Sequence, residues 1–140
     1  MSADITAETI RRWLQGSPFI AFLNLELLEV DVEAGAVAMK MPMRPEFERG
    51  GPLGGQFHGG PVAALIDTVG DFAVAVVVKG GVPTINFRVD YLRPAIKTGL
   101  VITAKVRRAG KSVGVVDVDV FNEQKALLAV GRATYSTLPA

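Results

Sequence analysis

The sequence predicts an α+β fold in which one long helix lies on an antiparallel sheet. Near the middle of the chain, residues 61–78 are apolar over a length that suits a buried helix. From residue 85 onward, apolar and polar residues alternate with a period of two, as in strands. No helical pattern separates these strands, so βαβ units are absent and the sheet should be antiparallel. With 140 residues, 49% of them hydrophobic, the chain is long enough for one domain, expected to span residues 1–140.

Composition excludes several classes of function. The formal charge of +1 gives no reason to expect a nucleic-acid partner or an anionic membrane surface. The absence of cysteine excludes disulfides, thiolate metal sites and a cysteine nucleophile, and a single histidine argues against a zinc site built on several histidines. Asp67 and Asp71 interrupt the one segment that resembles a membrane span, where each would cost about 2.5–3.5 kcal/mol. No basic region with an uninterrupted apolar run follows the N-terminus, so we expect a cytoplasmic protein.

The first half of the chain predicts a short helix, a hairpin and a loop. Residues 6–15 form an amphipathic pattern that Thr6 is suited to cap. A hairpin is expected from strands over 25–31 and 35–41, and glycines are concentrated between residues 50 and 60. This glycine-rich loop leads directly into the long helix.

The long helix should begin at Pro61, because proline is favoured in a first helical turn. About sixteen residues of helix are expected, with a stop near Lys79 and the two glycines that follow it. Small and branched apolar residues occur on every side, a pattern typical of a helix surrounded by protein.

Four strands should follow the helix. The first, over 85–91, alternates as a strand with one buried face, and Pro94 ends it. The next two are expected over 100–107 and around 116–120. The fourth, over 126–137, has apolar or small residues on both faces, as in a central strand or one that meets a partner.

A group of polar residues inside apolar sequence is the candidate for chemistry. His58, Asp67 and Asp71 lie on or beside a helix whose start is rich in glycine. Free N–H groups at a helix start can hold an anion or a developing oxyanion. Asp67 is two turns beyond Gly60, about 10 Å along the axis, so one chain does not place both at one reacting carbon. Pairing with a two-fold mate would bring the carboxylate of one chain to the helix start of the other.

At these residues the chain resembles the hotdog-fold acyl-CoA thioesterases of the phenylacetate-degradation type, from roughly residue 20 to the C-terminus. The matching features are Gly55-Gln56-Phe57-His58-Gly59-Gly60, Asp67 nine residues after the histidine, Thr84, and Phe87-Arg88-Val89-Asp90-Tyr91-Leu92-Arg93-Pro94-Ala95. The resemblance implies a hotdog fold, in which a curved antiparallel sheet wraps a long central helix. It also implies a homodimer with sites at the subunit interface, often a homotetramer, and hydrolysis of an aryl or short- to medium-chain acyl-CoA to the free acid and coenzyme A.

The resemblance assigns roles to four residues. Asp67 would act as general base or as nucleophile, the Gly59 N–H as oxyanion donor, His58 as the residue that shapes the loop, and Thr84 as a hydroxyl near the carboxylate. One departure is Pro52, where many members carry asparagine; Gln56 or another group would take that part. A thiol with a pKa near 8.5 leaves readily, so one base and one oxyanion site suffice. No metal or cofactor is required, because coenzyme A is part of the substrate.

Substrate contacts are predicted from the same resemblance and from local charge. Between residues 84 and 113 there are seven basic residues and one acidic residue, a balance of +6 that suits the phosphates of coenzyme A. Five phenylalanines form either an acyl pocket or part of the core: Phe19, Phe22, Phe47, Phe57 and Phe72. The candidate substrate-binding residues are Gly60, Gln56, Asp71, Arg93, Arg108 and Lys111.

The same residues are compatible with two other functions. A hydratase or dehydratase on the same fold would use His58 and Asp67 on the acyl chain, although the spacing fits a thioesterase better. The missing asparagine motivates a non-catalytic acyl-CoA binding module, in which Asp67 is a structural carboxylate. The stretch before the core is too short for a helix-turn-helix domain, which argues against a DNA-binding regulator.

Overall fold

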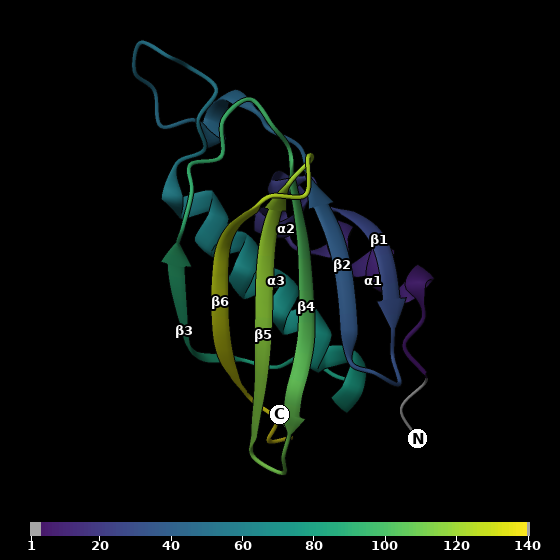
Figure 1. The fold of residues 1–140 in the computed structure, drawn as a ribbon. Helices are drawn as coiled ribbons and strands as arrows, with labels where there is room; N and C mark the ends of the chain where they lie inside the picture. The colour runs from purple at the N-terminus through teal and green to yellow at the C-terminus, as the bar shows by residue number, and fades with distance from the viewer. Residues whose placement is uncertain (1–3, 140) are drawn as a thin grey trace.

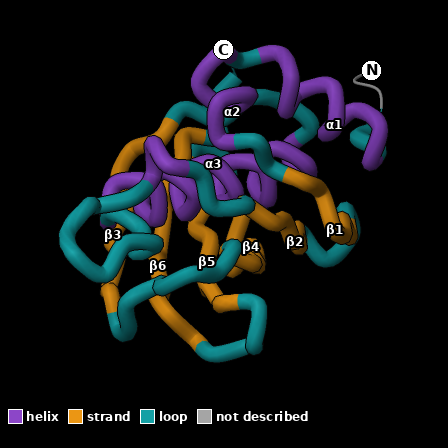
Figure 2. The backbone as a smooth tube through the Cα atoms, turned by 90° about the horizontal axis from the view of Figure 1, so that it is seen from above, coloured by secondary structure: helices purple, strands orange, loops and turns teal. Residues whose placement is uncertain are grey.

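The computed structural model describes residues 4–139 and consists of a six-stranded antiparallel sheet with a long helix on one face (Figure 1). The helices are α1 (Ala7–Gly16), α2 (Pro18–Leu23), the 3-10 turn η1 (Pro45–Phe47) and α3 (Gly59–Val78). The strands are β1 (Glu26–Asp31), β2 (Ala36–Met41), β3 (Thr84–Tyr91), β4 (Leu100–Ala109), β5 (Val113–Asn122) and β6 (Leu127–Ser136). Their order in the sheet is β1-β2-β4-β5-β6-β3. Figure 2 shows the helices gathered on one side of the strands, so the predicted hotdog fold is confirmed.

The long helix α3 has 20 residues instead of about sixteen, because it starts at Gly59, two residues before Pro61, and continues to Val78. His58 caps its first turn, and Lys79 ends it in a left-handed conformation, as the sequence indicated. Six apolar side chains of the helix are fully buried: Leu65, Ile66, Val69, Ala73, Val74 and Val76. α3 has the length and apolar composition of a membrane span, but most of it is buried inside the molecule, as in the core helix of a soluble protein.

The strands that α3 covers have the predicted alternation. Leu100 and Ile102 of β4, and Val118 and Val120 of β5, are almost completely buried, and their neighbours in sequence face outward. β6 lies between β5 and β3, so its expected position inside the sheet is confirmed.

β3 corrects one prediction. The expected strand with one buried face is an edge strand, and Ile85, Phe87 and Tyr91 are 54%, 39% and 55% exposed. α3 packs chiefly on β4 and β5, so it leaves much of β3, at the edge of the sheet, uncovered. An apolar strip on β3 is therefore open at the edge of the sheet.

The N-terminal segment forms two helices where one was expected. Thr6 caps α1, as predicted, and it does so through a reciprocal pair of hydrogen bonds with Thr9. α2 was missed, although Ser17 as cap and Pro18 at the first position are a recognisable start signal. The ring of Trp13 on α1 stacks on the ring of Phe72 on α3, with 5.9 Å between the ring centroids. The N-terminal helices therefore pack against the second half of α3.

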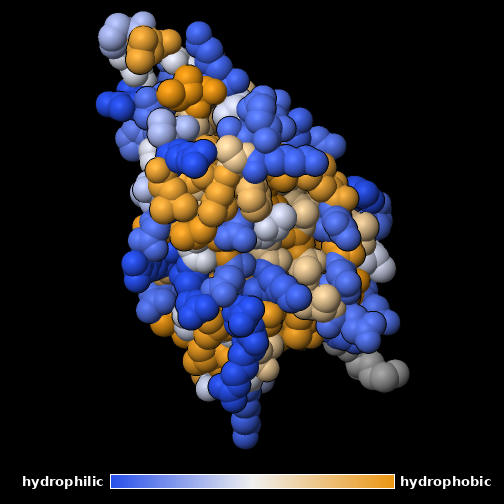
Figure 3. All heavy atoms as spheres, in the orientation of Figure 1, coloured by the Kyte–Doolittle hydropathy of each residue, from blue (hydrophilic) through white to orange (hydrophobic). Residues whose placement is uncertain are grey.

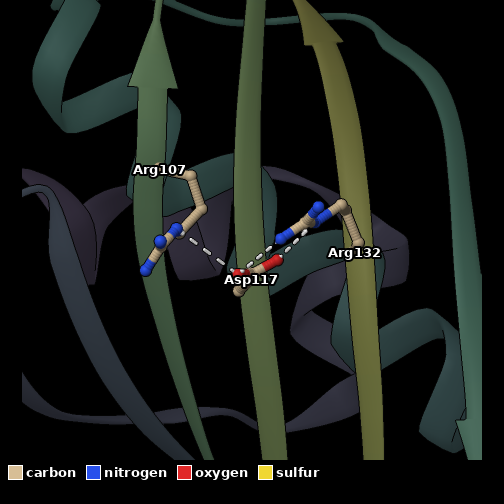
Figure 4. Close-up of polar contacts among 3 residues, drawn as sticks. All are labelled: Arg107, Asp117 and Arg132. Carbon is tan, nitrogen blue, oxygen red and sulfur yellow. Dashed lines mark hydrogen bonds and ion pairs between the residues drawn. The ribbon is translucent and has the colours of Figure 1, made fainter.

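The outer face of the sheet is polar. Asp117 on β5 lies between Arg107 on β4, at 3.6 Å, and Arg132 on β6, at 2.6 Å (Figure 4). The hydrogen bond from Arg132 holds the pKa of Asp117 below its usual value. Figure 3 shows hydrophilic residues across the middle of this face. The sheet therefore buries one face, the face that carries α3.

Candidate active site

Asp67 lies on α3 and is held by one pair of residues on neighbouring strands. The Thr84 hydroxyl donates to Asp67 Oδ1 at 2.8 Å, and the Tyr135 hydroxyl donates to the Asp67 carbonyl at 2.6 Å. Thr84 and Tyr135 are directly opposite each other on β3 and β6. Within residues 4–139, Asp67 Oδ2 accepts no hydrogen bond. The side chain is thus oriented through one oxygen while the other is left to act on a substrate or a water.

Tyr135 reaches the helix backbone because Gly70 has no side chain. Tyr135 is fully buried, and a Cβ at Gly70 would lie 2.5 Å from its hydroxyl oxygen. Burial, followed by the negative charges of Asp67 and Asp71, raises the pKa of this phenol. Tyr135 therefore stays protonated and remains a hydrogen-bond donor.

Asp67 opens into a cavity of about 510 Å³, named here the carboxylate pocket. Its lining is Trp13, Ser17, Phe19, Ile20, Asp67, Thr68, Asp71, Phe72, Ala75 and Gly81. Aromatic and apolar side chains from α1, α2 and α3 supply most of the wall, as in a site for an apolar acyl group. Two of the five phenylalanines singled out in the sequence, Phe19 and Phe72, are in this pocket.

Asp71 is the second carboxyl of the carboxylate pocket, one helical turn beyond Asp67. Burial, and then the charge of Asp67, raise the pKa of Asp71 to about 7. Near neutral pH this carboxyl is therefore about half protonated. In the part of the chain that the structure describes, no group of three or more histidine or acidic side chains is placed to hold a metal ion.

The start of α3 has one backbone donor without a partner. His58 Nδ1 accepts a hydrogen bond from the Gly60 N–H at 2.9 Å, and the His58 N–H donates to the Phe47 carbonyl at 2.7 Å. The Gly60 N–H is therefore occupied. The Gly59 N–H makes no hydrogen bond with residues 4–139, and it lies at the positive end of a 20-residue helix.

A second cavity, of about 450 Å³, surrounds this donor and is named here the helix-start pocket. Its lining is Arg49, Gln56, Phe57, His58, Gly59, Val62, Tyr91, Leu92, Arg93, Pro94, Ala95, Leu100, Val120, Leu128 and Ala129. The structure thus brings together four sequence candidates: Gln56, His58, Gly59 and Arg93. Tyr91, whose hydroxyl donates to the Gly59 carbonyl at 2.7 Å, was not singled out for a role. Its place in the Tyr-Leu-Arg-Pro string was the available signal.

The other candidates are not brought to these residues in a single chain. Asp67 is eight residues beyond Gly59, about 12 Å along the helix axis, and the two residues line different pockets. Arg108 is eight residues along β4 from Leu100, about 26 Å from the helix-start pocket, and Lys111 is farther along the same hairpin. Pro52 is in the exposed loop that projects beyond the start of α3 (Figure 1) and lines neither pocket.

Comparisons with known proteins show the family to which the chain belongs. The family model of the thioesterase superfamily matches residues 54–129, from the end of the glycine-rich loop into β6. A protein of Halobacterium salinarum, named only provisionally as an esterase, is 32% identical over 95% of this chain and 93% of its own. The medium/long-chain acyl-CoA thioesterase YigI of Escherichia coli is 29% identical, over 96% of this chain and 98% of its own.

A solved structure shows how far the likeness extends. The PaaI protein of the Escherichia coli phenylacetic acid degradation operon superposes with a TM-score of 0.82, over 95% of this chain and 93% of its own. At 23% identity this likeness concerns the fold. The family match and the Halobacterium relative go further, because together they cover the pockets, α3 and nearly the whole chain. The chain therefore belongs to the thioesterase superfamily.

Proposed function

We propose that this protein hydrolyses an acyl-CoA with an aryl or short- to medium-length acyl group to the free acid and coenzyme A. The observation that carries the proposal is the Asp67 carboxylate, oriented by Thr84 at 2.8 Å and open to a pocket with aromatic walls. The name of the Escherichia coli relative supports acyl-CoA as the substrate class. The resemblance of residues 55–60 and 87–95 to the thioesterases of phenylacetate degradation motivates the aryl acyl group in the proposal.

In the reaction, Asp67 takes a proton from water as the water oxygen attacks the thioester carbonyl carbon. The electron pair of the C=O bond moves to its oxygen, which the Gly59 N–H stabilises. Collapse of this intermediate breaks the C–S bond, and the proton on Asp67 passes to the leaving sulfur. A positioned base supplies about 10²–10⁴-fold, and one oxyanion donor about 10²–10³-fold. If Asp67 is instead the nucleophile, its carboxylate attacks the thioester carbonyl carbon and the C–S bond breaks, which gives a mixed anhydride and the coenzyme A thiolate. Water then hydrolyses the anhydride to the free acid and the Asp67 carboxylate, and the proton released goes to the thiolate.

The reaction requires a second copy of the chain. A reacting carbon must lie near both the base and the oxyanion donor, which are about 12 Å apart along one helix. The apolar strip of β3 is open beside Asp67's partner Thr84, where a second copy would cover it. A two-fold pair of α3 helices would then place Asp67 of one copy by Gly59 of the other. We therefore propose a homodimer, or a homotetramer built from such dimers.

Coenzyme A is assigned to the helix-start side of this shared site. Arg93 and Gln56 line the pocket around Gly59, which supports the proposal that they contact the thioester end of the coenzyme. Arg108 and Lys111 remain predictions for its phosphates, checked by a rise in KM on replacement with alanine. A cytoplasmic location also remains a prediction, checked by cell fractionation.

The test is thiol release from a panel of aryl, short-, medium- and long-chain acyl-CoA esters. Because the chain has no cysteine, a thiol reagent reports only coenzyme A. Asp67→Asn should lower kcat by about 10²–10⁴-fold with the fold intact. Asp119→Asn, which removes an exposed carboxylate from the outer face of the sheet, is the matched control and should keep full turnover.

The remaining outcomes separate the alternatives. Tight binding of acyl-CoA without turnover across the panel would replace the proposal with a binding module. Hydration of an enoyl-CoA without thiol release would replace it with a hydratase. A single turnover in H₂¹⁸O bears on the role of Asp67. Label found in the Asp67 carboxylate, with unlabelled acid, identifies the nucleophilic route, because general-base attack by water labels only the acid.

A further inference from the structure

One peptide unit at the start of α3 is bound at both of its polar ends by side chains. This is the peptide that joins Gly59 to Gly60. Its carbonyl accepts a hydrogen bond from the Tyr91 hydroxyl at 2.7 Å. Its N–H donates to His58 Nδ1 at 2.9 Å. The two side chains come from segments 33 residues apart, the end of β3 and the loop before the helix.

This peptide adjoins the candidate oxyanion donor. Two glycines in succession have more backbone freedom than any other pair, so an unsupported Gly59–Gly60 step would sample many orientations. The Gly59 N–H belongs to the preceding peptide and shares the Gly59 Cα with the bound one. Fixing the second peptide therefore restricts the direction of the first.

Tyr91 is held where it can do this. Opposite it on β6 is Ala129, and the N–H groups of Leu92 and Arg93 both donate to the Leu128 carbonyl, at 2.8 and 3.0 Å. The ring lies over Gly59, where a Cβ would be 3.2 Å from the phenol oxygen. Burial raises the pKa of Tyr91, so the phenol keeps its proton and stays a donor.

We propose that Tyr91 is a positioning residue for thioester hydrolysis, which together with His58 clamps the Gly59–Gly60 peptide and so directs the Gly59 N–H at the developing oxyanion. The inference rests on the proposed function and adds a residue to its machinery. Tyr91 does not touch the reacting atoms. Its contribution passes through the backbone of Gly59, so it concerns the transition state more than substrate binding.

The test removes one hydroxyl group. Tyr91→Phe keeps the ring and loses only the bond to the Gly59 carbonyl. With the best ester of the panel, kcat should fall about tenfold, because a small misplacement of a catalytic group is enough for such a loss. KM should stay within about twofold, since the binding surface is retained. Asn86→Ala, on the opposite face of the same strand, is the control and should change neither constant.

The partner of Tyr91 in the clamp gives a second readout. His58→Ala should lower kcat, and His58→Asn should restore most of it, because asparagine also caps a helix start. If both side chains act on one peptide, the double variant Tyr91→Phe/His58→Ala should lose less than the product of the two single losses.

The outcomes separate failure of the role of Tyr91 from failure of the proposed thioesterase function. No hydrolysis by the unmodified protein would overturn the proposed function and this inference together. Hydrolysis that Tyr91→Phe leaves at full kcat, or that it weakens only through KM, would overturn the inference alone. An equal loss in Asn86→Ala would do the same, because it would assign the effect to β3 in general.

Discussion

At the scale of single residues, the Asp71 carboxyl lowers the stability of the fold whenever it is ionised. Its pKa is raised from 3.8 to about 7, by burial first and by the charge of Asp67 second. Between these two values the unfolded chain has released a proton that the folded chain keeps. The free energy of unfolding therefore falls as the pH rises from about 4 to about 7, and is constant above that range. A shift of this size corresponds to about 4 kcal/mol.

Asp71→Asn should remove this dependence. The variant keeps the shape of the side chain without its charge, so at pH 8 its free energy of unfolding should exceed that of the unmodified protein by about 2–4 kcal/mol. Urea denaturation at several pH values between 4 and 8 measures the difference. Asp119→Asn, at an exposed position, should leave the slope unchanged. Equal free energies of unfolding of the unmodified protein at pH 5 and pH 8 would contradict the raised pKa of Asp71.

At the scale of elements, the contact between β6 and α3 depends on a missing side chain. Tyr135 donates to the Asp67 carbonyl only because Gly70 leaves room for its hydroxyl, which would lie 2.5 Å from a Cβ. Gly70→Ala should therefore displace the helix from the strand and lower the free energy of unfolding by about 1–3 kcal/mol. Thermal or urea unfolding measures the loss.

The control for this substitution is Gly16→Ala at the end of α1. Nothing lies within 4 Å of a Cβ at Gly16, so the added methyl meets no neighbour. Its effect should be close to zero or slightly stabilising, because alanine restricts the unfolded chain. Equal destabilisation by both substitutions would contradict the close approach of Tyr135 to α3.

The sequence predicted those elements whose patterns are local. Alternation along β4 and β5 appears in the sequence because α3 covers these strands, and the Thr6 cap lies next to the helix it starts. The same alternation in β3 was misleading, since exposure depends on where α3 ends across the sheet and not on the strand itself. α2 was missed for a different reason: six residues are too few for a helical period to be seen.

The candidate site was predictable in its parts but not in its connections. Spacing and resemblance singled out His58, Gly59, Asp67 and Thr84 as candidates, and the structure adds the hydrogen bond between Thr84 and Asp67. The two tyrosines were not found, although each donates to a carbonyl of α3 at a candidate residue. These contacts join positions 32 and 68 residues apart, and only the register of β3 on β6 brings them together.

At the scale of the whole molecule, the proposed mechanism divides its site between two pockets of one chain. The carboxylate pocket contains the proposed base and the helix-start pocket the proposed oxyanion donor, and none of residues 4–139 lines both. The open apolar strip of β3 gives a second copy a surface to cover. Assembly and turnover should therefore be lost together when the strip is made unfit for burial.

Phe87→Glu tests this link. It places a charge in the middle of the strip, where burial without a partner is strongly unfavourable, so the assembly should dissociate to a chain of 14.9 kDa. Leu28→Glu is the matched control, because Leu28 is also apolar and 48% exposed but lies in β1 at the opposite edge of the sheet. Light scattering gives the mass, circular dichroism the fold, and thiol release the turnover. Phe87→Glu should be folded, monomeric and inactive, while Leu28→Glu keeps both assembly and turnover. A folded monomer with full turnover would mean that a single chain brings its own base and oxyanion donor together, against the 12 Å spacing along α3.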